Sequence, residues 1–468
     1  MDSRSIAQAT GRTELPLHER TSYLDSNGPQ RHIYSSTRTI HHSDGRSHSP
    51  FEVTSSLHQT AAPTPSVTQP TQLTTPPRSL LTKPSAAKTT KKVPAALCAI
   101  GSEKSVDPVR QLALLLPGHN EELIIAQTIQ SALVAGQDIK DIYVVNDAST
   151  DRTSKIATAL LGKDHVLNVK RSGKALAVNK AIKKFKIEKR YVWLHVADAD
   201  SIFSPDYFRH YKSKLDAMKY AVAVGFVQSL QGNWISTYRA LTYTFSQHIS
   251  RRIQSKLGMI SVFPGPITCF RTDILRQLEM DGASLTEDFD MTLQVHRKQL
   301  GKIVFIPKAV NYTQDPQTLS DFCKQNMRWQ RGFFQGVRKY KIGLRGQRID
   351  LSLGFQMLQM ILFALQICFL LPFIIYTTGN WKIIPVAVCA DFVLSGAIAI
   401  WASFAAKRWN MLGALPYFYF LRWIEIGIYV TAFIEIMVLG RFRTESKGWA
   451  TEGRRYKIST RALQEVSG

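Results

Sequence analysis

Residues 112–121 read Leu-Ala-Leu-Leu-Leu-Pro-Gly-His-Asn-Glu. The apolar run 112–116 has the length of a buried strand, and Pro117-Gly118 end it. Apolar residues at helical spacing follow and stop at Gly136, which predicts a helix. The same alternation repeats along the next residues, so we expect an α/β domain with a mostly parallel sheet. The predicted strands cover 112–116, 141–145, 166–169 and 191–196, and the predicted helices cover 122–135, 152–161 and 174–185.

Polar residues follow three of these strands. They are Pro117-Gly118-His119-Asn120-Glu121, Asn146-Asp147 and Asp198-Ala199-Asp200. Ligands of parallel sheets bind beyond the carboxyl ends of the strands. Two carboxylates spaced as Asp-x-Asp can share a hard divalent cation such as Mg²⁺, together with substrate phosphates. A solvated turn explains most such dipeptides equally well.

Three further groups of residues have either a chemical or a plainer structural interpretation. Gly173-Lys174 can offer backbone N–H groups and an ammonium to a phosphate, although basic first turns are common on surfaces. Thr286-Glu287-Asp288 concentrates carboxylates, but Thr286 could also be an N-cap followed by a favourable acidic first turn. The basic stretch 321–350 suits a membrane-surface helix, or contact with a diphosphate and a sugar ring.

Composition divides the 468 residues into dissimilar parts. Residues 1–108 hold 11 of the 20 prolines, lack apolar periodicity and are rich in Ser and Thr, which predicts a disordered tail without a secretory leader. The formal net charge is +24, of which +4 belongs to this tail. Such a charge favours an anionic partner. Five cysteines without a CxxC pair exclude a disulfide scaffold and a structural zinc site as organising features.

The C-terminal part contains three apolar segments, 353–377, 381–405 and 411–440. The first is 25 residues without a charge, long enough to cross a bilayer, although a buried core helix is the alternative. The third carries charges, so it either crosses or lies at the interface. The basic tail 441–468 prefers the cytoplasmic side. We therefore divide the chain into a tail (1–108), a catalytic domain (109–318), basic interfacial helices (319–350), a transmembrane region (351–440) and a basic tail (441–468).

Taken together, the motifs resemble those of processive membrane synthases of glycosyltransferase family 2, such as poly-N-acetylglucosamine, cellulose, chitin and hyaluronan synthases. The resemblance covers residues 110–440. It is carried, in order along the chain, by Pro117-x-x-Asn120-Glu121, Asn146-Asp147, Gly173-Lys174-Ala175, Asp198-x-Asp200, Thr286-Glu287-Asp288 and Gln325-x-x-Arg328-Trp329. Segment 263–268 resembles the acceptor-binding Gly-Pro loop of chitin and hyaluronan synthases.

The resemblance implies a GT-A fold and inverting transfer from a UDP-sugar. It assigns the general base to Asp288 and the metal, Mg²⁺ or Mn²⁺, to Asp200 and Asp198. The remaining assignments follow the motifs. The resemblance assigns nucleotide-sugar binding to Asn120, Glu121, Asp147, Lys174 and Asp198. It assigns acceptor and diphosphate binding to Gln325, Arg328 and Trp329. Of these, Trp329 would stack on the acceptor sugar. The chemistry needs such residues, because a sugar hydroxyl requires a base and a diphosphate leaving group requires cations.

These assignments lead to a main hypothesis and alternatives. We expect a multi-pass cell-membrane enzyme with a cytoplasmic catalytic domain that extends a β-linked polysaccharide at the lipid bilayer. The resemblance implies that this polysaccharide is built from N-acetylglucosamine. Transfer of one sugar to a lipid acceptor, a glucose-specific synthase and a catalytically silent sugar-nucleotide sensor are the alternatives. Relatives usually begin with membrane segments and this chain does not, which leaves open whether it works with a membrane partner subunit. No nucleic-acid motif is present, so no nucleic-acid partner is expected.

Overall fold

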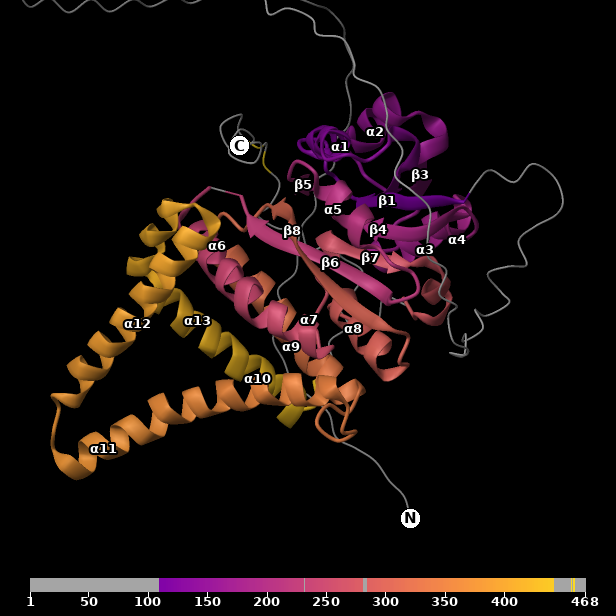
Figure 1. Ribbon diagram of the computed structural model, residues 1–468. Helices are drawn as coiled ribbons and strands as arrows, with labels where there is room; N and C mark the ends of the chain where they lie inside the picture. Colours follow the sequence, from indigo (N-terminus) through magenta and orange to yellow (C-terminus); the bar gives the residue numbers. More distant parts are fainter. Residues whose placement is uncertain (1–108, 231, 281–283, 442–455, 457, 459–468) are drawn as a thin grey trace, which may run out of the picture. The chain divides into compact units, whose positions relative to one another are not determined.

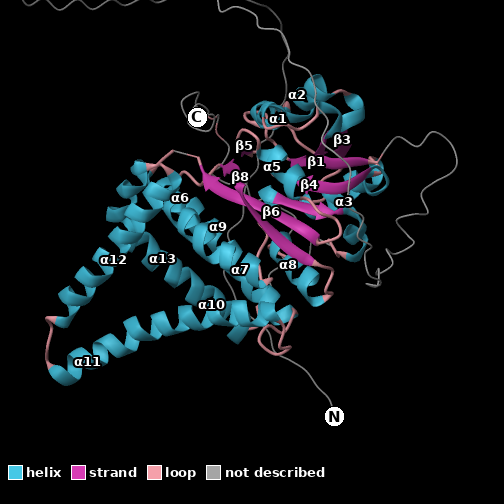
Figure 2. Ribbon diagram, viewed as in Figure 1, coloured by secondary structure: helices cyan, strands magenta, loops and turns pink. Residues whose placement is uncertain are grey.

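The computed structural model describes residues 109–230, 232–280, 284–441, 456 and 458, so the predicted tail 1–108 and most of the tail 441–468 lie outside the described residues. An eight-stranded sheet with the order β3-β2-β1-β4-β7-β6-β8-β5 organises the first part (Figures 1 and 2). The strands are β1 (Arg110–Gly118), β2 (Ile142–Asp147), β3 (Val166–Val169), β4 (Tyr191–Val196), β5 (Ile202–Phe203), β6 (Tyr220–Ser229), β7 (Thr268–Arg271) and β8 (Lys302–Thr313).

Helices cover both faces of this sheet, and a further set follows it in the chain. They are α1 (Ile125–Val134), α2 (Thr153–Leu161), α3 (Lys174–Lys184), α4 (Ile187–Arg190), α5 (Tyr207–Lys214), α6 (Trp234–Ser246), α7 (Arg252–Leu257), α8 (Glu287–Arg297), α9 (Leu319–Lys339), α10 (Arg348–Leu365), α11 (Leu371–Thr378), α12 (Ile383–Ala406) and α13 (Leu415–Phe433). Each predicted strand and helix of the first half appears within three residues of its predicted ends, which confirms the α/β class.

The sheet is mixed. Strands β3, β2, β1 and β4 are parallel, as is the pair β6 and β8, but β7 runs antiparallel to β4 and β6, and β5 antiparallel to β8. The prediction of a mostly parallel sheet is therefore confirmed, because β6 and β8 run in the same direction as the first four strands, and β7 and β5 are the two exceptions. The start of β7 pairs with the end of β4, Thr268 with Val196, so β7 enters from the carboxyl edge. An apolar run shows that a strand is buried, but only its connections set its direction.

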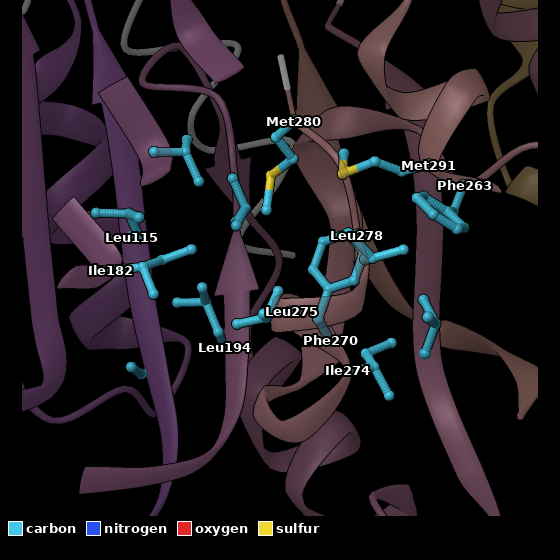
Figure 3. Packing of buried hydrophobic residues seen from close by; sticks show 14 of the residues in the cluster. Leu115, Ile182, Leu194, Phe263, Phe270, Ile274, Leu275, Leu278, Met280 and Met291 are labelled. Carbon is cyan, nitrogen blue, oxygen red and sulfur yellow. The ribbon is translucent and has the colours of Figure 1, made fainter. Parts of the chain in front are cut away.

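Strand β1 is apolar throughout because both of its faces are covered. Leu114 is fully buried against α1, α2 and α5, whereas Leu115 is fully buried on the other face. Figure 3 shows this second face, where Leu115 lies near Ile182 of α3 and Met291 of α8 belongs to the same cluster. Because β1, β2 and β4 are parallel, their carboxyl ends lie at one edge of the sheet. Both faces of the sheet at this edge are covered by packed side chains.

Helices α8 and α9 approach each other unusually closely. A Cβ atom added to Gly332 of α9 would lie 2.5 Å from Cγ2 of Thr286, and one added to Gly336 would lie 2.5 Å from Cε1 of Phe289. Real Cβ atoms do not approach other atoms so closely, so both positions require glycine. An ion pair of 2.8 Å between Lys339 Nζ and Asp290 Oδ1 joins the same two helices.

The helices after α9 contain the predicted membrane segments. Helix α10 continues through a π-helical turn, residues 366–370, into α11, and together they include segment 353–377. Segment 381–405 corresponds to α12, which among the described helices is the one that is long and apolar enough to cross a membrane. Segment 411–440 includes α13, whose side chains pack along α9, as in the ring pairs Phe334–Tyr429 and Phe334–Phe433.

We expect Gly332→Ala to lower the free energy of unfolding by about 1–3 kcal/mol, the usual cost of forcing an extra methyl into a packed contact. Thermal unfolding of the detergent-solubilised chain measures the change. Gly354→Ala in α10 is the control, because nothing lies within 4 Å of its added Cβ. Equal unfolding temperatures for the two variants would show that the α8–α9 contact tolerates a side chain.

Candidate active site

A cavity of about 1000 Å³ opens at the carboxyl edge of the sheet. Its wall combines the ends of β4 and β8, the start of α3, the loop before β7, the start of α8 and one face of α9. Helices α10 and α13 add Leu353, Met357, Met360 and Tyr429 to the wall. The cavity therefore extends from the strand ends to the helices that contain the predicted membrane segments.

Lys174 holds two acidic residues together at the strand-end side of the cavity. Its Nζ lies 2.5 Å from Oδ1 of Asp198 and 3.3 Å from Oε1 of Glu287. Burial lowers the pKa of Lys174, but the two carboxylates outweigh it and raise the pKa above the ordinary lysine value. The ammonium thus stays charged, beside the position where the resemblance expects a diphosphate.

Asp198 and Asp200 both line the cavity after β4. Asp200 is buried, with 5% of its surface exposed, and Asp198 is partly exposed. Carboxylate oxygens are the ligands that Mg²⁺ and Mn²⁺ accept, and two of them suffice when substrate phosphates complete the coordination. Asp198 is paired with the Lys174 ammonium, so a divalent ion bound there would share this carboxylate with Lys174. The donor set therefore fits a divalent ion, although no group of three such ligands occurs within the described ranges.

Asn120 and Asp147 hydrogen-bond to the backbone of neighbouring loops. Neither is among the described residues of the cavity wall. The Asp147 carboxylate accepts from the backbone N–H groups of Ser172 and Gly173, both at 2.8 Å. Gly173 has a φ of 84°, which favours glycine, and it directly precedes α3 and Lys174. Oδ1 of Asn120 accepts from the N–H of Thr150 at 2.8 Å. Their predicted contact with the nucleotide stays a prediction.

Glu121 lies next to Asn120 and, unlike it, reaches the cavity wall. Its backbone N–H donates to Oγ1 of Thr153 at 2.7 Å, which joins the loop after β1 to the start of α2. The side chain is buried, with 5% of its surface exposed. Of the two predicted nucleotide residues in this loop, Glu121 is thus the one that the fold brings to the cavity.

Asp288 occupies the first turn of α8 and faces the cavity. Burial raises its pKa, the neighbouring Glu287 carboxylate raises it further, and Lys174 offsets part of the change, so that the pKa is about 6. The backbone N–H groups of Gly265 and Phe289 donate to its two oxygens at 3.3 and 2.8 Å. A carboxylate held in this way with a pKa near neutral suits a general base. Thr286 precedes α8 but makes no side-chain capping bond, so the N-cap interpretation does not account for it.

Gln325, Arg328 and Trp329 of α9 all line the cavity opposite α8. Nη1 of Arg328 donates to the carbonyl oxygen of Leu285 at 3.2 Å, just before the Thr286-Glu287-Asp288 motif. The guanidinium of Arg239 lies over the ring of Trp329, with its Cζ 4.7 Å from the ring centroid. The fold thus brings the three α9 residues, Lys174, Glu121, Asp198, Asp200 and Asp288 to one cavity.

The motif analysis missed several polar residues of the wall, among them Gln314, Asp315, Arg239 and Arg251. Gln314 and Asp315 follow β8, and the polar strand-end pattern that revealed Asp198 could have found them. Arg239 and Arg251 lie in α6 and in the π-helical turn 247–251, where no local pattern distinguishes a cavity residue from a surface one. Gly265, in the predicted acceptor loop, is also on the wall, and a Cβ there would lie 2.8 Å from Nζ of Lys174.

Comparison with known proteins shows which proteins the first part of the described chain is similar to. Residues 109–332 match the family model described as glycosyltransferase like family 2. The chain is 25% identical over 234 residues to poly-beta-1,6-N-acetyl-D-glucosamine synthase of Staphylococcus aureus (strain COL), covering 49% of this chain and 56% of that protein. It is 28% identical over 246 residues to the probable glycosyltransferase YdaM of Bacillus subtilis (strain 168), covering 49% and 57%. The match thus spans little more than half the length of these relatives.

Among solved structures, a similar one is mannosyltransferase PcManGT from Pyrobaculum calidifontis in complex with GDP-Man and Mn²⁺. The TM-score is 0.44 and the sequence identity 17%, over 66% of this chain and 87% of that one.

The raised pKa of Asp288 predicts the pH dependence of turnover. A base acts when deprotonated, so the rate should fall as the pH drops through about 6 and be about tenfold below its plateau at pH 5. Asp288→Asn should reduce turnover by about 10²–10⁴-fold. Initial rates between pH 5 and 8 and calorimetric titration with UDP test both statements. Unchanged turnover in the Asn variant, with UDP still bound, would remove Asp288 as the base.

Proposed function

Residues 109–332 form a glycosyltransferase domain of family 2, and from this premise we propose that the chain is a membrane-bound inverting glycosyltransferase that adds N-acetylglucosamine from a UDP-sugar to a growing β-linked polysaccharide. The observation that carries the proposal is the meeting of three groups in one cavity. These are the Asp288 base, the Lys174–Asp198 pair and the aromatic ring of Trp329. The Staphylococcus aureus relative, named for synthesis of a polymer of this sugar, supports the choice of donor.

The proposed reaction is a single displacement. An acceptor hydroxyl forms a bond to the anomeric carbon of the donor sugar while the bond from that carbon to the UDP oxygen breaks. Asp288 takes the hydroxyl proton, and UDP leaves with the electron pair. With one carboxylate base and no second carboxylate acting as nucleophile, the anomeric configuration inverts.

Cations of the cavity wall stabilise the departing UDP. Lys174 stays protonated beside the strand ends, and Arg328 of α9 lines the same cavity. Their charge is worth most in a partly closed cavity, where water screens it less. Asp198 and Asp200 would hold Mg²⁺ or Mn²⁺, which supplies further positive charge to the diphosphate when bound.

A lipid acceptor is the second candidate, because one end of the cavity wall is apolar. Leu353, Met357 and Met360 of α10 would suit a hydrocarbon chain, whereas the aromatic rings of Trp329 and Tyr429 suit sugar rings. The product distinguishes the two. A glucose-specific synthase would differ in its donor, so the choice of UDP-sugar distinguishes it. A catalytically silent sensor is disfavoured because Asp200 and Asp288 are both present.

We expect UDP release by membranes that contain the chain with one member of a UDP-sugar panel, and loss of release when EDTA removes divalent ions. UDP-N-acetylglucosamine should be the best donor, and size-exclusion chromatography should show a long product that a linkage-specific glycosidase digests. Asp288→Asn membranes are the control for background release. A product with one added sugar in an organic extract would replace the polymer with the lipid acceptor.

Contacts that return the chain to the catalytic domain support a proposal for its localisation. Asp350, at the start of α10, pairs with Arg297 of α8 at 2.5 Å, and this hydrogen-bonded pair lowers the pKa of Asp350 to about 2. Arg408, just after α12, donates to the carbonyl oxygen of Ser229 at the end of β6, at 2.9 Å. The segment that contains α10, α11 and α12 thus begins and ends at the catalytic domain, as an antiparallel hairpin does.

Helix α13 then stays with the catalytic domain along its length. Glu425 accepts from the hydroxyl of Tyr238 in α6 at 2.8 Å, and Glu435 pairs with Arg331 of α9 at 2.7 Å. Beyond it, Ile458 is buried among Ile124, Ile202 and Leu230 of the catalytic domain. We therefore propose two crossings, by α10–α11 and by α12, with α13 at the interface.

Charges at the ends of the hairpin support its orientation. Arg345 and Arg348 precede the first leg and Lys407 and Arg408 follow the second, whereas the connection between the legs carries Lys382. Basic residues favour the cytoplasmic side, so the catalytic domain is cytoplasmic in this proposal.

An impermeant maleimide tests this topology on intact cells that express cysteine variants in a background without native cysteines. We expect Asn380→Cys, between the two legs, to be labelled from outside. Asn410→Cys, after the second leg, should be labelled only after permeabilisation, as should a cysteine added at the C-terminus. External labelling of the C-terminal cysteine would mean an odd number of crossings and would overturn the hairpin.

A further inference from the structure

Two buried arginines on the cavity wall have no part in the reaction described above. Arg239 of α6 is 3% exposed, and Arg251 of the π-helical turn 247–251 is 9% exposed. Arginine is rarely buried to this extent unless its charge is paired. Both reach the cavity. What they contact there decides whether they support the fold or bind a substrate.

Arg251 lacks the partners that a structural arginine normally has. Its Nη1 is buried and has no hydrogen-bond partner among the residues that the structure describes. Burial lowers the pKa of Arg251 to about 10, and the attraction of Asp288 offsets only part of that effect. Leaving a buried cation so poorly paired is costly for the fold alone. A substrate atom that accepts a hydrogen bond would supply the missing partner.

Arg239 is placed differently, against the aromatic side of the cavity. Its Nη1 donates to the hydroxyl of Tyr243 at 2.8 Å, and its guanidinium lies over the rings of Trp329 and Phe322 at 4.7 and 5.1 Å. Asp315, after β8, is 3.8 Å from its Nε. A planar guanidinium held by these contacts fixes the orientation of the Trp329 ring.

The positions of these arginines favour the acceptor over the donor. Arg251 interacts electrostatically with Asp288, which takes the proton of the acceptor hydroxyl in the proposed reaction. Arg239 stacks on Trp329, the residue expected under the acceptor sugar. Lys174, the cation proposed at the donor diphosphate, lies at the strand-end side of the cavity with Asp198 and Glu287.

We propose that Arg251 is an acceptor-binding residue, whose Nη1 donates to an oxygen of the terminal acceptor sugar beside the hydroxyl that Asp288 deprotonates. Arg239 is a positioning residue that holds Trp329 under the same sugar. This inference rests on the proposed function, because it requires a sugar acceptor in the cavity. It adds a specific ligand class to this part of the wall: a sugar ring with hydroxyl, acyl or carboxylate oxygens, and not the diphosphate.

The test compares Arg251→Met with Arg252→Met. Arg252 is the next residue in the chain and is exposed, so the control removes the same charge without touching the cavity. With an N-acetylglucosamine tetrasaccharide as acceptor probe, Arg251→Met should raise the acceptor KM about ten- to hundredfold, the effect of one lost charge-assisted hydrogen bond. The donor KM and the slow hydrolysis of UDP-sugar without acceptor should stay within about twofold of wild type. Arg252→Met should change none of these values.

Other outcomes have defined meanings. Equal acceptor KM values for the two Met variants, at equal unfolding temperatures, would overturn the acceptor role of Arg251, and so would a rise confined to the donor KM. If Arg251→Met fails to fold, Arg251→Lys serves instead: it keeps the charge but shortens the reach, and a normal acceptor KM in it would count against the proposal. A wild-type chain that releases no UDP from any sugar nucleotide would instead refute the proposed function.

Arg239 is tested through the ring that it positions. Arg239→Lys keeps the charge but loses the planar stack, so the acceptor KM should rise while the donor KM stays unchanged. The effect should be absent when the variant is made in a Trp329→Phe background, in which the acceptor KM is already raised. Additive effects of the two substitutions would show that Arg239 does not act through Trp329.

Discussion

The close contact between α8 and α9 is the constraint on which the site depends. Gly332 and Gly336 remove the side chains that would separate the helices, and the ion pair of Lys339 with Asp290 joins them one turn further along. Helix α8 carries Asp288 in its first turn, and α9 carries Arg328 and Trp329 just before Gly332. A single helix contact therefore sets the distance between the base and the residues expected to hold the acceptor and the leaving group.

The cavity beside this contact holds an aspartate and a lysine whose pKa values are shifted by the same neighbouring carboxylates. Asp288 and Lys174 are both partly buried and close to other carboxylates, yet the consequences for their pKa values differ. Burial and Glu287 raise the pKa of Asp288 to about 6, whereas Asp198 and Glu287 keep Lys174 protonated. The same cluster of acidic residues thus contains a carboxylate that is deprotonated at neutral pH, the proposed base, and an ammonium that stays charged. Group transfer to a hydroxyl from a diphosphate needs both at once.

The parts that the sequence predicted share a local signal. Buried parallel strands are apolar runs of a definite length, and polar residues directly after them mark the carboxyl edge, which is how Asp198 and Asp200 could be found. The direction of β7 depends on the connection that precedes it, which no local pattern describes. The close helix contact at Gly332 depends on Thr286, which is 46 residues away in the sequence, so it has no local signal either. Arg251 differs from Arg252 only in the side of a helical turn on which it lies. Its burial became visible only once the fold had placed that turn against the cavity.

The end of the cavity is built by the same helices that are proposed to anchor the chain. Leu353 and Met357 lie in α10, whose start is fixed to α8 through Asp350 and Arg297, and Tyr429 lies in α13, which packs along α9. A movement of the hairpin relative to the catalytic domain would therefore displace the acceptor end of the wall but not the strand ends that carry Asp198 and Asp200. Because α10 and the strand ends carry different parts of the wall, acceptor binding should depend on the bilayer more than donor binding does.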